Sequence, residues 1–196
     1  MTQSRTSITM YEMNQKFSLL QANNNEPYLW TRDTGKEIRE KLFDALDNIK
    51  RGEVVVIDFA GIKAFDFSFA NELFGKTLLK MPVDYPGKFV IVENLTDYTR
   101  ENLFNAISNL SLAIAEKKSN GAMSLLGKVH PVDEATFNLI CQSAHPMTTN
   151  ELVKLMDVKI QAMNERLSKL VDMGVIRRSR SLSQAGREQY EYTKIL

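Results

Sequence analysis

Two aspartates and a serine lie close together in the stretch VVVIDFAGIKAFDFSFANELFGK, residues 54–76. Asp58 ends a run of valines, and Ser68 stands two residues after Asp66, where a helix is expected to begin. Paired carboxylates can act as general acid and base, and a serine at a helix start can cap the helix or accept a phosphate. No histidine, second nucleophile or metal-binding cluster lies near them in the sequence. The stretch therefore does not predict an enzyme active site.

Other chemical signatures are weak. Cys141 is the only cysteine, and His130 and His145 are the only histidines, which excludes an internal disulfide and disfavours a Cys/His zinc site. The glycines at 61, 75 and 87 are isolated and form no phosphate-binding loop. We therefore expect no catalytic residue, no metal and no cofactor.

The composition is that of a globular protein that works in water. The 196 residues carry a net charge of +1, so contact with a polyanion would depend on local charge placement. The first residues, MTQSRTSITMYEMNQ, lack the apolar core of a signal peptide, and no window reaches the roughly 18 apolar residues of a membrane span. We expect a cytoplasmic protein that does not contact membranes.

The first part of the chain alternates helices and strands. Apolar spacing predicts helices at 33–50, capped by Asp33 or Thr34, at 69–80, ended by Pro82, and after Thr96. Continuous apolar runs predict covered strands at 54–57 and 89–92, and Asn120-Gly121 predicts a type I′ hairpin between 112–116 and 123–126. This alternation favours a partly parallel sheet. Before residue 30 the pattern is less definite, with candidate strands at 7–10 and 17–20 and a polar loop at 21–25.

A second part is expected from Val129 onward. Apolar spacing predicts three helices, the first carrying Phe137, the second capped by Thr148 or Thr149, and the third ending at Gly174. A hairpin of 175–178 and 189–192 follows. We predict two domains, at 1–128 and 129–196.

Residues 54–80 resemble the STAS domain, the fold of sulphate-transporter tails and bacterial anti-sigma-factor antagonists. They are most similar to a bacterial STAS-like domain in which a DFSGV strand end leads to an SSFADELFG helix start, here DFAGI and FSFANELFG. The resemblance extends from about Gly35 to Leu126 and implies a mixed sheet covered by helices.

In the antagonists this site reads Asp-Ser-Ser-Gly, and the second serine is phosphorylated by a kinase that is also the anti-sigma factor. The matching residues are Asp66, Phe67, Ser68 and Phe69, so the acceptor is kept and two neighbours are changed. The resemblance implies phosphorylation at Ser68 and partner binding by Asp58, Asp66, Phe67 and Phe69. The alternative is that Ser68 only caps the helix.

The stretch TTNELVKLMDVKIQAMNERLSKLVDMGVIRRS, residues 148–179, resembles the winged helix-turn-helix of bacterial transcription regulators. That resemblance implies DNA contacts from the third helix and from the wing, at Lys159, Gln161, Asn164, Arg177, Arg178 and Arg180. The segment 129–196 holds nine basic and eight acidic residues, which is little positive charge for a DNA-binding domain.

The sequence thus predicts an α/β protein, with a STAS-like mixed sheet followed by a small winged-helix domain of the α+β type. We interpret it as a bacterial transcription regulator whose first domain senses a protein partner and whose second domain binds DNA, and winged-helix regulators commonly form homodimers. The resemblance to the antagonists implies a histidine-kinase-like ATPase or an anti-sigma-like factor as partner. Two alternatives remain open: an interaction adaptor that does not bind DNA, and a sensor of a small ligand in the STAS-like cleft.

Overall fold

A computed structural model describes residues 14–183 and 185–196. Its central sheet has the strand order β1-β3-β5-β6-β7, in which β1 to β6 run parallel and β7 is antiparallel to β6. The strands are β1 (Asn14–Ser18), β3 (Val54–Asp58), β5 (Phe89–Glu93), β6 (Ala113–Lys117) and β7 (Met123–Gly127). The protein is therefore of the mixed α/β class, as the alternation of elements predicts.

Helices cover one face of this sheet. They are α2 (Arg32–Asn48), α3 (Phe67–Ala70), the π-helical turn η1 (Asn71–Gly75), α4 (Lys76–Asp84) and α5 (Asp97–Ser108). Alternate strand residues, including Val55, Ile57 and Val92, share a core with this layer. A short helix α1 (Leu19–Ala22) and the parallel pair β2 (Tyr28–Leu29) and β4 (Ala64–Phe65) lie at the carboxyl ends of the strands.

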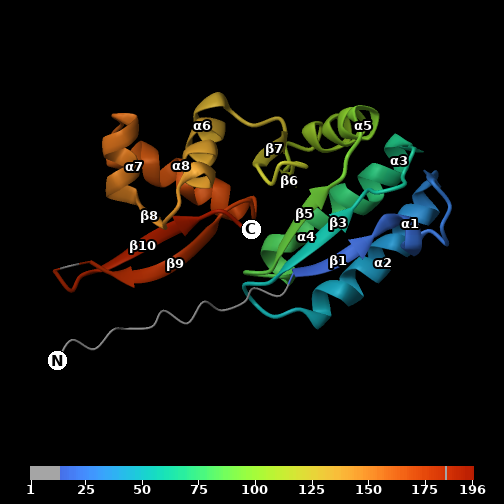
Figure 1. The fold of residues 1–196 in the computed structure, drawn as a ribbon, viewed down its shortest axis with the longest axis horizontal. Coiled ribbons are helices and arrows are strands. Elements are labelled where there is room, and N and C mark those ends of the chain that lie inside the picture. The colour runs from blue at the N-terminus through green and yellow to red at the C-terminus, as the bar shows by residue number, and fades with distance from the viewer. Residues whose placement is uncertain (1–13, 184) are drawn as a thin grey trace.

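The C-terminal part covers the other face of the same sheet. It consists of α6 (Pro131–Gln142), β8 (Met147–Thr148), α7 (Thr149–Met156), α8 (Ile160–Asp172), β9 (Arg177–Leu182) and β10 (Glu188–Thr193). The remaining strand residues, among them Val56 and Ile91, share a core with Phe137, Leu167 and Ile176 of this part. Figure 1 shows the β9–β10 hairpin extending from the junction away from the sheet. Both faces of β3 and β5 are thus covered, which explains their continuous apolar sequences.

Most predicted elements are confirmed, and three local details are wrong. Thr31, rather than Asp33 or Thr34, caps α2. Pro82 lies inside α4, which continues to Asp84 although a proline inside a helix removes a backbone hydrogen bond. The turn between β6 and β7 has a positive φ at Gly121 and not at Asn120, so it is not of type I′.

The early part of the chain differs from its prediction. The candidate strand at 7–10 lies outside the described residues. The strand expected at 17–20 begins earlier, at Asn14, and Leu19 already belongs to α1, which Ser18 caps. The predicted polar loop at 21–25 begins within this helix. The division into two domains and the winged-helix assignment stay predictions.

Candidate functional site

The carboxyl ends of β1 and β3 carry an ion pair at the sheet edge. Asp58 is buried and accepts hydrogen bonds from Asn94 Nδ2 at 2.6 Å and from the Ala60 amide at 2.9 Å. Lys16 Nζ lies 2.8 Å from its carboxylate. Burial acts to raise the pKa of Asp58, but the hydrogen bonds from Lys16 and Asn94 outweigh it and hold the pKa below its ordinary value. Asp58 therefore holds the loop after β3 in place, and its assignment as a partner-binding residue stays a prediction.

Asp66 caps α3. Its carboxylate accepts from the Phe69 amide at 2.7 Å and from the Thr31 amide at 3.1 Å, which joins the starts of α3 and α2. Ser68 is the second residue of this helix, half-buried, and its hydroxyl makes no hydrogen bond to any described residue. The alternative that Ser68 caps the helix is therefore wrong, and Asp66 serves that role instead.

We expect Asp66→Ala to lower the free energy of unfolding by about 1 kcal/mol, the usual cost of a lost N-cap. Asp66→Asn should recover most of this loss because an amide oxygen can still accept the Phe69 hydrogen bond. Urea unfolding of both variants measures the difference, with Ser68→Ala as the control. An equal loss in Ser68→Ala would contradict the cap assignment.

The two phenylalanines beside Ser68 have opposite environments. Phe67 is 54% exposed, whereas Phe69 is fully buried and packs 6.0 Å from the Phe65 ring. Phe69 is thus a core residue, which corrects its assignment as a partner-binding residue. The helix period explains the difference, since two residues along a helix turn the side chain by about 200°, to the opposite face.

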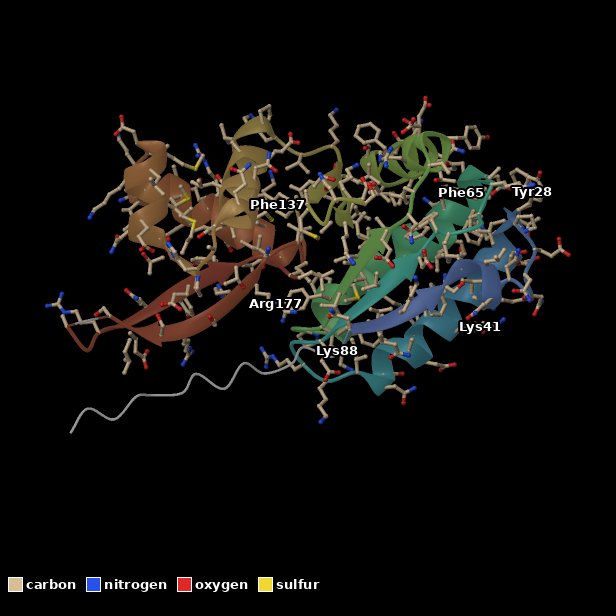
Figure 2. All side chains as sticks on the ribbon, in the orientation of Figure 1. Tyr28, Lys41, Phe65, Lys88, Phe137 and Arg177 are labelled. Atoms are coloured by element: carbon tan, nitrogen blue, oxygen red, sulfur yellow. The ribbon has the colours of Figure 1, made fainter. Side chains whose placement is uncertain are left out.

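An exposed aromatic pair lies beside this helix start, where no site was predicted. Tyr28 and Trp30 are each 46% exposed and stack with ring centroids 5.9 Å apart. The Asp66 amide donates to the Leu29 carbonyl, which places the chain at Trp30 beside the chain at Phe67. Figure 2 shows Tyr28 at the same end of the molecule as Phe65. The sequence signal was the apolar run YLW between two polar stretches.

The helices α7 and α8 meet at a tight turn in the C-terminal part. Asp157 ends α7 with a left-handed backbone, and Lys159 precedes the first residue of α8. Lys159, Gln161 and Asn164 are exposed on the first turns of α8. Further along the helix, Glu165 and Asp172 line a hollow against Leu79 of α4. The predicted DNA contacts Lys159, Gln161 and Asn164 thus lie together at the N-terminal end of α8.

The three predicted arginines of the hairpin separate into two groups. Arg178 and Arg180 are exposed on β9, and the Arg178 guanidinium lies 4.8 Å from the Tyr190 ring centroid. Arg177 points into the junction: it donates to the carbonyls of Ile195 and Gly52 and stacks over Phe89. Figure 2 shows Arg177 between the hairpin and the sheet. Arg177 therefore joins the two parts, and its assignment as a DNA contact stays a prediction.

Cys141 is a partly buried free cysteine in the C-terminal part. Burial raises the pKa of Cys141 to about 12, so its thiol is almost entirely protonated near neutral pH. Among the described residues, no group of three or more histidine, cysteine or acidic side chains could hold a metal ion. Within the same residues, no helix has the length and apolarity needed to cross a membrane.

Comparison with protein-family models matches residues 34–99 to a family described as a STAS-like domain of unknown function. The match begins in α2, passes through β3, the α3–η1–α4 helix and β5, and ends in the first turn of α5. It therefore contains Asp58, Asp66, Phe67 and Ser68, and it ends before the C-terminal part. A search of curated proteins finds no match. The match supports a STAS-like domain at residues 34–99 of this chain.

Proposed function

We propose that this protein is a regulator that binds DNA through residues 129–196 and receives its signal through the STAS-like domain. The order α6, α7, α8 and hairpin, with β8 paired to β10, supports this proposal, because a winged helix has the same order of elements. The observation that carries the proposal is the exposure of Lys159, Gln161 and Asn164 together at the start of α8. A helix presented in this way can enter a major groove.

The exposed side chains divide the work of recognition. Gln161 and Asn164 can each pair with an adenine edge through two hydrogen bonds, which reads sequence. Lys159, Arg178 and Arg180 can contact phosphates, which positions the protein without reading sequence. The near balance of charge in residues 129–196 predicts weak non-specific binding, so base contacts must supply much of the affinity for a preferred site.

Substitutions can separate these two roles. Arg180→Ala should weaken binding to every DNA sequence and reduce the slope of log affinity against log salt by about 1. Gln161→Ala should leave that slope unchanged and reduce discrimination between preferred and altered sites, at about 1–3 kcal/mol per lost base contact. Fluorescence anisotropy at several salt concentrations measures both quantities. Lys36→Ala, an exposed substitution on α2, is the matched control. Equal behaviour of all three variants would contradict this use of α8 and the hairpin.

A second candidate function is an interaction adaptor, favoured by the exposed aromatic rings of Tyr28, Trp30 and Phe67. Aromatic side chains dominate the energetics of many protein interfaces. We propose a protein partner at this surface, of the histidine-kinase-like ATPase or anti-sigma-like class that the STAS resemblance implies. Phosphate on Ser68 would add negative charge two residues from the Asp66 carboxylate and so change this surface electrostatically.

Trp30 is the only tryptophan, so its fluorescence reports directly on this surface. Titration of a purified ATPase of this class should shift the Trp30 emission to shorter wavelength as the ring leaves water. Phe67→Ala should weaken that binding by at least about tenfold, since aromatic anchors contribute roughly 2 kcal/mol or more. Leu155→Ala, an exposed apolar substitution on α7, serves as the control. An unchanged affinity in Phe67→Ala would remove Phe67 from the interface.

A further inference from the structure

A hollow of about 380 Å³ lies where the hairpin meets the sheet. The loop before β3 contributes Arg51 and Gly52, and the loop before β5 contributes Gly87. The hairpin contributes Arg178 and Ser179 from β9 and Thr193 from β10. The hollow is thus built from both parts of the protein, and Figure 2 shows Arg177 and the loop residue Lys88 in this region.

Two glycine turns shape this hollow around arginine side chains. Gly87 has φ of +77°, which favours glycine, and a Cβ atom there would lie 2.6 Å from Arg51 Nε, so a side chain at this position would displace Arg51. Gly52 has φ of +92°, and its carbonyl accepts a hydrogen bond from Arg177. The Arg177 guanidinium lies 4.8 Å from the Phe89 ring centroid, and both residues line the hollow.

The hollow is lined by several donors that no carboxylate of the described residues pairs with, although Arg178 also lies over the Tyr190 ring. Within the described residues, Arg51 and Arg178 form no ion pair, and the hydroxyls of Ser179 and Thr193 form no hydrogen bond. Asp172 lines an adjoining hollow with both arginines, yet it makes no ion pair with either. Arg39 and Arg100, in contrast, each pair with a buried glutamate. The described residues that line the hollow thus include three arginines, one of them the Arg177 that joins the two parts, and two hydroxyl side chains, but no carboxylate.

We propose that this hollow binds a phosphate group. Phosphate oxygens accept paired hydrogen bonds from guanidinium forks, and hydroxyls complete such sites. Because Arg51 belongs to the STAS-like part and Arg178 to the hairpin, the bound phosphate would join the two parts. The same chemistry fits a free phosphorylated compound or a phosphate of a nucleic-acid backbone.

Calorimetric titration of the full-length protein with sodium pyrophosphate, at constant ionic strength set with chloride, tests the free form. Saturable binding is expected, and Arg51→Ala and Arg178→Ala should each weaken it at least about tenfold, as for loss of a charged hydrogen-bond donor. Arg51→Lys, which keeps the charge and loses the fork, should give an intermediate affinity. Arg32→Ala, an exposed arginine at the start of α2, is the control, and melting without ligand verifies that every variant folds.

A second experiment measures duplex DNA binding by the wild type and by Arg51→Ala at several salt concentrations, and compares the slopes of log affinity against log salt. A slope reduced by about 1 in Arg51→Ala, without pyrophosphate binding, identifies the backbone phosphate as the ligand. Pyrophosphate binding that depends on both arginines identifies a free phosphate compound, and it does so even when wild type binds no DNA and the proposed function fails. Absence of both effects overturns the site.

Discussion

Ile91→Ala should lower the free energy of unfolding by about 3 kcal/mol, within the range measured for truncation of a buried isoleucine. Ile91 is fully buried in the middle of β5, where it pairs in register with Val56 and Ala115. Its side chain belongs to the core shared with the C-terminal helices rather than to the core under α2 and α5. The substitution therefore removes contacts between the two parts of the chain.

Because this core is shared, the two parts should unfold in one transition, in both wild type and variant. Urea unfolding followed by tyrosine circular dichroism and by Trp30 fluorescence measures this, since Trp30 lies between β2 and α2, in the N-terminal part of the chain. Leu182→Ala, at a side chain that is 70% exposed, is the control and should change stability by less than about 0.5 kcal/mol. Two separate transitions would contradict a shared core.

Glu116→Gln should lower the free energy of unfolding by about 2 kcal/mol near neutral pH. Glu116 is 2% exposed, and Arg100 Nη2 and Lys118 Nζ lie 2.8 and 2.6 Å from its carboxylate oxygens. Loss of a buried charge partner costs about 3–5 kcal/mol, and the partial exposure of both cations reduces that figure. The neutral amide can still accept hydrogen bonds but no longer balances either charge.

The same substitution should flatten the loss of stability in acid. Burial acts to raise the pKa of Glu116, but the hydrogen bonds and charges of Arg100 and Lys118 outweigh it, so the folded pKa lies below the unfolded one. The stabilisation is thus present above the unfolded pKa of about 4.3 and is lost as pH falls toward the folded pKa. Glu116→Gln should show a shallower decline below about pH 5, while Glu101→Gln, an exposed control, should follow wild type. If the stability of Glu116→Gln fell with decreasing pH as steeply as that of the wild type, this role of the Glu116 carboxylate would be contradicted.

The elements that position the STAS-like site were predictable because each has a local signal. The valines of β3 and the apolar run of β5 predict strands that are covered on both faces, and Thr96 predicts the start of α5. The residues that pack against these elements could not be predicted from the sequence. The sequence shows that Val56 is buried, but only the tertiary arrangement shows that the C-terminal helices cover it.

The candidate site residues were harder to predict, since exposure depends on neighbours distant in the sequence. Phe67 and Phe69 look alike in the sequence, yet the helix period places one in water and the other in the core. Arg177 and Arg178 look equally suited to bind phosphate, yet strand alternation and the Gly52 carbonyl direct Arg177 into the junction. The exposed pair Tyr28 and Trp30 was missed because β2 is too short to show the alternation of buried and exposed residues that is typical of a strand.

The most direct test of the proposed function is a salt titration of DNA binding by the full-length protein. A fluorescent duplex from upstream of its own gene is titrated by anisotropy at increasing salt, beside a shuffled duplex of the same composition. The proposal predicts tighter binding to the upstream duplex and a linear fall of log affinity with log salt, whose slope reports the number of phosphate contacts. Absence of binding to both duplexes at low salt would contradict DNA recognition and leave the adaptor function.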